Sequence, residues 1–166
     1  MGKQVTPAQL AKQLRGFSDR LDRWQQIAPR MHGYLLAREK GRWKTQGASE
    51  GDRWPKQQPK WARLKTKLGI EPVPLRWLPG KERLFPSLTK KNHREHLWRK
   101  TFDGVHFGTK VPYAWRHALG KGKNPLGEQI PQRRFAHLSD RSQERLTQLL
   151  AVYIARGNSR GNRWDK

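Results

Sequence analysis

Two histidines three residues apart, His93 and His96, form the spacing in this chain that comes closest to a metal site. On a helix they would share one face, where a zinc ion could bind both rings. No third ligand is spaced to join them, and the segment leads into a predicted strand, which would point the two rings to opposite faces. No metal or other cofactor is therefore expected. The absence of cysteine also removes thiolate ligands and disulfides.

The other residues capable of catalysis are scattered along the chain. The 13 acidic residues show no paired arrangement of the kind used for general acid–base chemistry. His106 and His117 have no carboxylate at a fixed short spacing and are interpreted as packed or surface side chains. The sequence also lacks a phosphate-binding glycine loop and a Gly-x-Ser-x-Gly turn. It therefore predicts no catalytic residue and gives no support for an enzyme.

The strongest compositional signal is positive charge. The chain has 36 Lys and Arg against 13 Asp and Glu, a formal net charge of +23 at pH 7. Such an excess is typical of proteins that act beside nucleic acid, an anionic membrane or an acidic protein. No apolar run is long enough to span a membrane, and the N-terminus has no apolar signal core. We expect a polyanionic or acidic partner in a reducing cytosol, without membrane insertion or secretion.

Basic residues and tryptophans alternate between Arg38 and Lys67. This pattern is typical of phosphate neutralisation combined with base stacking, although tryptophans among lysines more often pin a loop to the protein body. No helix-turn-helix, RRM or zinc-finger pattern is present, so contact with DNA would be independent of sequence. The candidate contacts with DNA or with an acidic partner are Arg42, Lys44, Arg53, Lys56, Lys60, Arg63, Lys65 and Lys67.

A long helix is predicted at the N-terminus. Thr6, Pro7 and Gln9 form a capping signature, and apolar residues then recur at spacings of three and four as far as Leu35. The helix is expected to run to about Arg38, with a kink at Pro29. Its apolar stripe either packs on a sheet or faces a neighbouring subunit, and both interpretations remain open.

The periodicity disappears between Lys40 and Pro86, where Gly, Pro, Gln and Lys dominate. This segment is too long for an ordinary connector. It is therefore predicted to be an extended arm, a functional loop or a segment that becomes ordered on a partner. Within it, a short helix is predicted from about Pro59 to Leu68, because Trp61 and Leu64 share a face with Leu68.

A β-hairpin is predicted around Asp103-Gly104, the strongest turn signal in the chain, with strands over His96–Phe102 and Val105–Thr109. The flanking segments are predicted as a short turn or helix over Leu84–Thr89, a Gly/Pro-rich loop after Gly120, a candidate last strand at Gln132–Phe135, and a final helix capped by Ser139 or Asp140 and stopped by Gly157.

These elements predict one α+β domain over residues 1–156, since 166 residues suffice for one ordinary domain and not for two. A long kinked N-terminal helix and a C-terminal helix would pack on a small antiparallel sheet. A long basic extended arm would occupy about residues 40–86, and a basic flexible tail residues 157–166. Only 34% of the residues are apolar, but eight tryptophans argue against wholesale disorder.

Three motifs occur in order along most of the chain. They are Trp43 to Pro55 with Gly47, Gly51 and Trp54; Leu78 to Leu88 with Gly80 and Ser87; and Phe107-Gly108-Thr109, Pro112-Tyr113-Ala114, His117 and Gly120, followed by Ile130-Pro131 and Arg133-Arg134-Phe135. Taken together they resemble the virion morphogenesis or tail completion family of tailed bacteriophages, the Mu-like head–tail joining proteins. Ala118 and Ala136 depart from the pattern, where the family has Gln and often Leu.

The resemblance implies a structural protein of the phage neck and tail junction, which completes the tail or joins it to the head. It implies a ring, hexameric in this family, whose partners are further copies of the chain and other neck, connector or tail-tube proteins, with packaged DNA in the channel as a further contact. The location would be the virion, and the host cytoplasm during assembly. The alternative from another class is a monomeric, nonspecific nucleic-acid-binding protein.

The third motif is interpreted as an assembly surface. Tyr113 offers a large rigid contact, and Arg133 and Phe135 are of the types enriched at interface anchors. Alternatively, Tyr113 and Phe135 pin a loop over the sheet. The predicted subunit or partner interface consists of Tyr113, His117, Arg133, Phe135, Trp54 and Trp61.

Overall fold

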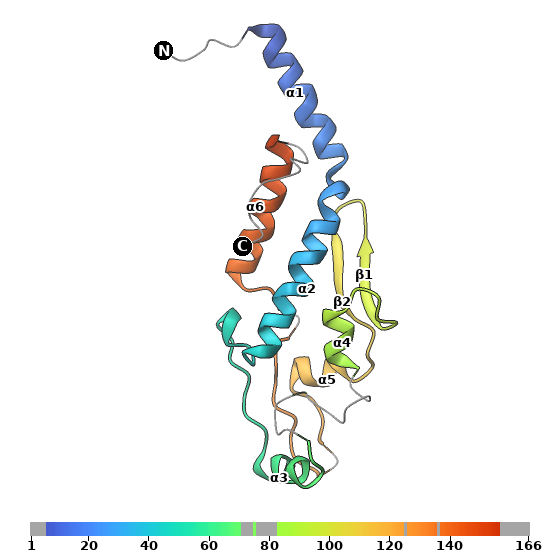
Figure 1. Cartoon of the computed structure of the whole chain (residues 1–166), viewed down its shortest axis with the longest axis vertical. Helices are drawn as coiled ribbons and strands as arrows, with labels where there is room; N and C mark the ends of the chain where they lie inside the picture. The colour runs from blue at the N-terminus through green and yellow to red at the C-terminus, as the bar shows by residue number, and fades with distance from the viewer. Residues whose placement is uncertain (1–5, 71–74, 76–82, 125, 136, 157–166) are drawn as a thin grey trace.

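The computed structural model describes residues 6–70, 75, 83–124, 126–135 and 137–156. The chain forms an elongated α+β structure with α1 at one end and α3 at the other (Figure 1). Its elements are α1 (Pro7–Asp22), the 3-10 turns η1 (Trp24–Ile27) and η2 (Ala48–Glu50), α2 (Ala28–Lys44), α3 (Pro59–Lys67), α4 (Leu84–Thr89), β1 (His96–Lys100), β2 (Val105–Thr109), α5 (Ala114–Leu119) and α6 (Asp140–Arg156). The predicted fold class is confirmed.

The N-terminal helix begins as predicted but is interrupted earlier. The Thr6 hydroxyl accepts a hydrogen bond from the Gln9 backbone N–H at 3.3 Å, and the Gln9 side chain accepts one from the Thr6 N–H at 2.9 Å. The interruption is η1, and not a kink at Pro29. Pro29 lies in the first turn of α2, where its missing N–H has no helical partner to lose. The second helix then continues to Lys44 instead of ending near Arg38.

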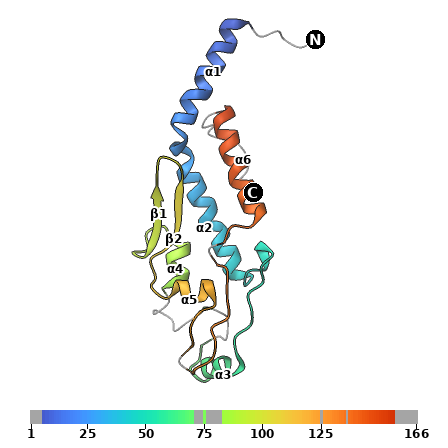
Figure 2. The same cartoon turned by 180° about the vertical axis from the view of Figure 1, so that it is seen from behind.

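Helix α2 runs through the middle of the molecule, with the hairpin on one side and α6 on the other (Figures 1 and 2). On the hairpin side, His32 Nε2 lies 2.8 Å from His96 Nε2, and the His32 ring stacks on Trp98 with centroids 4.2 Å apart. On the other side, α6 packs mainly on η1 and α1, where the Tyr153 hydroxyl donates to the Arg23 carbonyl at 3.0 Å. The packing on the sheet is therefore made by α2 and α4, and α6 packs on the N-terminal helices.

The hairpin forms where Asp103-Gly104 predicts it. The antiparallel strands pair from His96 opposite Thr109 to Lys100 opposite Val105. Thr101 closes the turn with hydrogen bonds to the Gly104 carbonyl and to Asp103. The first strand stops at Lys100, two residues before the predicted end. No further strand is present among the described residues, so the candidate strand at 132–135 is wrong.

The tryptophans at the start of the predicted arm belong to the hydrophobic core. Trp43 and Trp54 pack edge to face with ring centroids 5.2 Å apart. The loop between them turns back at Gly47, whose φ is +87° and where a Cβ atom would lie 2.0 Å from the Asp52 carbonyl oxygen. Only glycine fits this position. The interpretation of tryptophans as loop pins is therefore confirmed for both residues.

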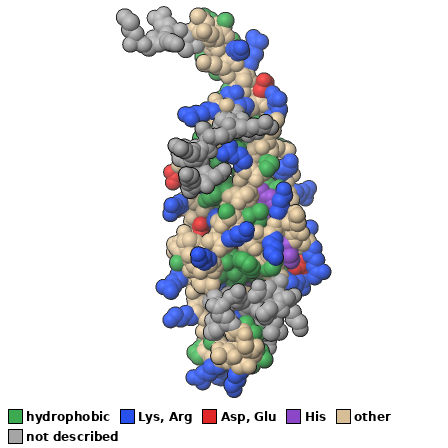
Figure 3. Space-filling model, viewed as in Figure 1, with side chains coloured by type: hydrophobic (Ala, Val, Ile, Leu, Met, Phe, Trp, Pro, Cys, Tyr) green, Lys and Arg blue, Asp and Glu red, His purple; other side chains and the backbone are tan. Residues whose placement is uncertain are grey.

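The remaining core residues come from both halves of the chain. Around the two tryptophans pack Leu84, Leu88, Val111, Ala114 and Phe135. Most of the predicted arm after Ile70, residues 71–74 and 76–82, and the predicted tail 157–166 lie outside the described residues. None of the helices in the described ranges is long and apolar enough to cross a membrane. Lys and Arg side chains lie along the full length of the face in Figure 3, with few acidic ones among them.

Candidate functional site

The third motif folds into one compact structure in which its two parts meet. Helix α5 carries His117 and ends at Gly120, which has a φ of +66°. A Cβ atom at Gly120 would lie 2.9 Å from the Gln132 backbone nitrogen, so the glycine permits the later segment to lie against the helix end. The Arg133 N–H then donates to the His117 carbonyl at 2.8 Å. The Gly/Pro-rich loop after Gly120 therefore begins and ends in the same structural unit.

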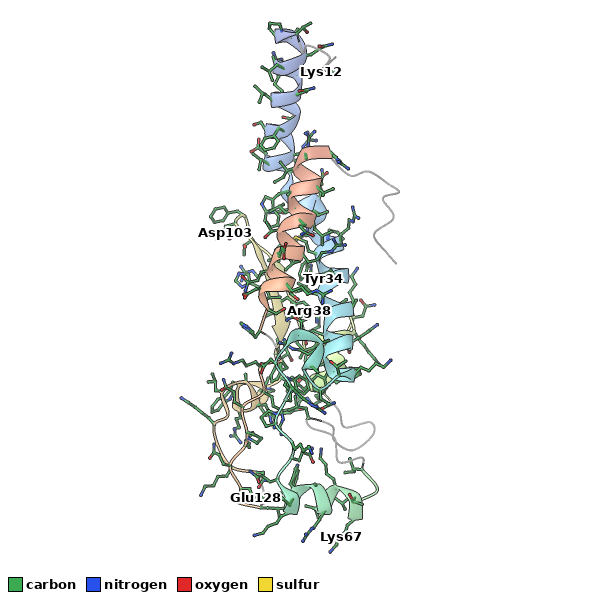
Figure 4. All side chains as sticks on the ribbon, turned by 90° about the vertical axis from the view of Figure 1, so that its left-hand side faces the viewer. Lys12, Tyr34, Arg38, Lys67, Asp103 and Glu128 are labelled. Carbon is green, nitrogen blue, oxygen red and sulfur yellow. The ribbon has the colours of Figure 1, made fainter. Side chains whose placement is uncertain are left out.

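A pocket of about 490 Å³ opens between this unit and α3. It lies toward the end of the molecule where Figure 4 labels Lys67 on α3 and Glu128 on the long loop. Four of the six predicted interface residues line it, namely Tyr113, His117, Arg133 and Trp61. The sequence therefore identified four residues that the fold brings together, and the predicted assembly surface is concave at these residues.

The other two predicted interface residues are located elsewhere. Trp54 and Phe135 are 4% and 2% exposed and belong to the hydrophobic core. Direct contact of these side chains with a partner is not compatible with that burial. For Phe135 the alternative interpretation, a side chain that pins a loop, agrees with the structure. Tyr113 is 36% exposed, and its ring meets His117 edge to face at 6.1 Å.

The pocket is strongly positive. Its described lining includes Lys65, Arg116, Lys123 and Arg133 and contains no Asp or Glu. Lys65 and Arg133 are 2% and 4% exposed, so two of these cations lie inside the protein. Arg133 donates through its terminal nitrogens to the carbonyls of Pro131 and Pro55 at 3.3 and 3.2 Å. Those bonds fix the guanidinium beside the cavity.

Burial leaves two polar atoms of this wall unsatisfied. Arg133 Nε and His117 Nδ1 are buried and have no hydrogen-bond partner within the described part of the chain. Burial lowers the pKa of Arg133 to about 10. Burial, with the charges of Arg133 and Lys65, lowers the pKa of His117 to about 4. His117 is therefore neutral at pH 7, and both groups would be stabilised by an anion.

The predicted basic contacts divide into exposed and buried residues. Six of them are exposed, namely Lys44, Arg53, Lys56, Lys60, Arg63 and Lys67. Lys65 lines the pocket, and Arg42 is fully buried. Arg42 therefore has no surface on which to meet DNA or an acidic partner, and that part of the prediction is wrong.

Arg42 instead belongs to an ionic cluster on α2 that the sequence analysis missed. It donates to the carbonyls of Phe135 and His137 at 3.1 and 2.6 Å, and Arg38 also donates to the His137 carbonyl. Glu39 accepts from Arg38 at 2.6 Å and lies 3.8 Å from Arg42. Burial raises the pKa of Glu39 to about 7, although the two arginines act in the opposite direction. The cluster joins α2 to the segment before α6.

The same cluster extends to the start of α6. Glu50 lies 3.0 Å from Arg38 Nε and accepts hydrogen bonds from Ser139 and Ser142 at 2.5 and 2.8 Å. Burial acts to raise the pKa of Glu50, but the two hydroxyls and Arg38 outweigh it and hold the pKa below its usual range. Figure 4 labels Arg38 on α2, close to the first turns of α6. The spacing of Arg38 and Arg42 on one helical face was the available sequence signal.

Helix α1 presents a second candidate surface. None of its residues is buried, and its apolar side chains Leu10, Leu14, Phe17 and Leu21 are 44–61% exposed. The helix projects beyond the rest of the molecule, with only its C-terminal end beside α6 (Figures 1 and 2). The apolar stripe read from the sequence therefore has no partner among the described residues along most of α1.

The arrangement of these groups favours binding. No carboxylate of the described residues faces His117, and no group of three His, Asp or Glu side chains in the described ranges could hold a metal. His93 and His96 do not act together, because His96 pairs with His32 and with the Ser87 carbonyl. The chain offers a basic pocket beside α3, an apolar helix at the opposite end, and exposed cations that include those of α3.

Comparison with models of known protein families, with curated proteins and with solved structures found no match.

Proposed function

We propose that this protein is a structural assembly protein of a tailed bacteriophage, acting at the neck and tail junction to complete the tail or join it to the head. In this role it forms a ring of identical subunits, hexameric as the resemblance implies. The observation that carries the proposal is α1, a helix that exposes a continuous apolar stripe and projects from the body.

A projecting amphipathic helix is suited to an interface between subunits. Monomeric soluble proteins rarely expose contiguous apolar patches, and an apolar helix face commonly binds in a groove of another polypeptide. When one subunit offers the helix and the next subunit offers the receiving surface, the contact is head to tail and generates a ring if the rotation closes. This favours, of the two interpretations of the stripe, the one in which α1 faces a neighbouring subunit.

The charge of the chain sets a second requirement. Several copies of a +23 chain repel one another unless acidic proteins or DNA lie close by. A neck or tail junction provides both, since packaged DNA passes through it and other virion proteins surround it. The exposed lysines and arginines from Lys44 to Lys67 would then face the channel or an acidic neighbour.

Electron micrographs of lysates from phage lacking the gene test this function. Separate full heads together with unjoined or aberrant tails are expected. Complementation with Leu14→Gln/Phe17→Gln, two exposed α1 positions, should fail, whereas Gln13→Ala/Ser18→Ala on the same helix should restore joined particles. Normal virions in the absence of the gene would remove the proposal.

The mass of the purified protein in high salt, measured by light scattering, tests ring formation. The unmodified protein is expected to form oligomers, either alone or after addition of tail proteins. The Leu14→Gln/Phe17→Gln variant is expected to stay monomeric in the same conditions. Three results together would instead support nonspecific nucleic-acid binding. The protein would stay monomeric with and without tail proteins, it would bind arbitrary duplex DNA, and loss of the gene would leave virions normal.

A further inference from the structure

We propose that the pocket between α3 and α5 binds an acidic peptide segment of a partner protein, with a carboxylate seated against Arg133 and His117. This deepens the proposed function, on which it rests only for the partner's identity. The exposed cations elsewhere on the surface attract any polyanion, whereas the pocket offers a concave site for a single carboxylate.

Positive charge is buried beside the pocket. Arg133 is nearly inaccessible to water, and no Asp or Glu of the described residues lines the cavity. The acid on the facing loop, Glu128, accepts a hydrogen bond from Asn124 at 3.0 Å and does not line the pocket. Holding the Arg133 guanidinium away from water is unfavourable unless an opposite charge is near. A carboxylate in the pocket would supply that charge.

Two buried donors on the pocket wall lack acceptors. Arg133 Nε is a buried donor with no acceptor within the described ranges, while its terminal nitrogens are held by Pro131 and Pro55. His117 Nδ1 is buried on the same wall and also has no partner there. The guanidinium and the neutral imidazole can each donate, so a ligand oxygen that reaches either atom would supply the acceptor that it lacks. Charge-assisted bonds of this kind are among the stronger ones available to a small ligand.

The concave shape of the site favours a peptide over duplex DNA. The phosphates of duplex DNA lie on a convex surface and would meet the exposed lysines before reaching cations inside a cavity. An extended peptide can insert one acidic side chain while its neighbours contact the walls, where Trp61, Tyr113 and Ile130 provide aromatic and apolar surface. A cavity of about 490 Å³ lies within the range of sites that enclose a small ligand.

Fluorescence anisotropy with a labelled octapeptide of alternating glutamate and leucine tests the proposal on the full chain. Saturable binding is expected, with a matched glutamine–leucine peptide binding at least about tenfold more weakly because it lacks the charge. Arg133→Gln should also weaken binding of the acidic peptide about tenfold or more. In NMR titrations, the acidic peptide should raise the pKa of His117.

Control variants separate the pocket from general charge. Arg116→Gln/Lys123→Gln removes two exposed cations that line the pocket, and Lys60→Gln/Lys67→Gln removes two exposed cations of α3 that do not. The first pair should weaken binding several-fold and the second less than about twofold. The first pair also tests the site if Arg133→Gln fails to fold. Equal losses in both pairs would overturn the proposal.

A 12-base-pair duplex serves as the competing probe. Duplex DNA should bind through the exposed lysines, with similar losses in both double variants. If Arg133→Gln weakens DNA binding selectively while the two peptides bind alike, the pocket is a phosphate site and the proposal is wrong. Normal virions without the gene, together with selective peptide binding, would remove the phage function and leave the peptide site intact.

Discussion

Helices α1 and α2 have nearly the same length and share one apolar stripe in the sequence, yet they differ in burial. Helix α1 has 16 residues and buries none of them, whereas α2 has 17 and buries seven. Their neighbours explain the difference. The hairpin, α4 and the segment before α6 surround α2. Within the described ranges, α1 contacts the body at its C-terminal end, where Arg20 donates to the last carbonyls of α6.

Apolar spacing in a sequence identifies one face of a helix and does not identify what covers that face. In α2 the covered face is not purely apolar, because Arg38, Glu39 and Arg42 are buried beside Leu35 and Trp43. In α1 the face is more regularly apolar and remains exposed. A helix whose apolar face is left uncovered by the described residues of its own chain is suited to assembly.

The largest loss of stability is expected for Arg42→Ala on α2. The substitution removes the buried donor of the Phe135 carbonyl and leaves Arg38 as the remaining described partner of the His137 carbonyl and of Glu39. Removing one member of a buried ionic cluster costs about 3–5 kcal/mol of the free energy of unfolding. Urea denaturation followed by circular dichroism measures it. Lys44→Ala, near the cluster in sequence but exposed, is the control and should change stability by less than about 0.5 kcal/mol.

A loss below about 1 kcal/mol for Arg42→Ala would contradict this account of the cluster. It would mean that α2 is held by its apolar contacts alone. The two helices would then differ only in how much apolar surface they bury.

The next largest effect is expected for Gly47→Ala in the loop that follows α2. A Cβ atom there would lie 2.0 Å from the Asp52 carbonyl oxygen, so the return of Trp54 onto Trp43 would have to shift, at a cost of about 2–3 kcal/mol. Gly51 is the matched control, because it has a similar positive φ but a Cβ atom there would meet no other atom within 4 Å. Thermal melts should show a loss of about 1 kcal/mol for Gly51→Ala. Equal losses would show that backbone strain, not the close contact, dominates.

A smaller effect is expected from pH through His32, which links α2 to the hairpin. Burial, with the nearby charges of His96 and Lys91, lowers the pKa of His32 to about 4, below its unfolded value near 6.5. The neutral ring therefore stabilises the fold fully above pH 6.5, and the contribution is lost as pH falls toward 4. Between pH 7 and 5 the free energy of unfolding should fall by about 2 kcal/mol from this group.

The variant His32→Gln tests the assignment by removing the titrating ring. Its stability should be lower at pH 7, and the slope of stability between pH 7 and 5 should become shallower. His117, whose pKa is also lowered to about 4, keeps a slope of the same sign, whereas Glu39, whose pKa is raised to about 7, adds a slope of opposite sign in both proteins. An unchanged slope would show that His32 is not held neutral by its position between α2 and the hairpin.

Local signals in the sequence predicted several elements because short-range chemistry determines them. The capping residues at Thr6 and Gln9, the Asp103-Gly104 turn and the helix beginning at Pro59 each depend on a few neighbouring residues. The position of the break before α2 could not be predicted in this way. Pro29 was the visible signal, but a proline is tolerated in a first helical turn, and η1 is stabilised by long-range packing on α6.

The candidate site was predicted in its residues but not in its shape. The motif order brought Tyr113, His117 and Arg133 together as a set, and the fold adds Trp61 and Lys65 from α3 to form a cavity. The burial of Arg42 and Phe135 could not be predicted, because it depends on the segment before α6 crossing the end of α2. The charge or aromatic character of a side chain indicates what it can bind and does not indicate whether it is buried or exposed.

The smallest effect on stability is expected for Leu14→Gln on α1, and it tests the difference in burial between α1 and α2 directly. Leu14 is 61% exposed and Leu35 on α2 is 3% exposed, so the same substitution compares an exposed and a buried position of one apolar stripe. Leu14→Gln should change the free energy of unfolding by less than about 0.5 kcal/mol. Leu35→Gln should lower it by several kcal/mol, because it removes a buried side chain and buries an amide. If urea denaturation shows comparable losses for both, α1 is covered in the isolated protein, and the exposed stripe cannot serve as a free subunit interface.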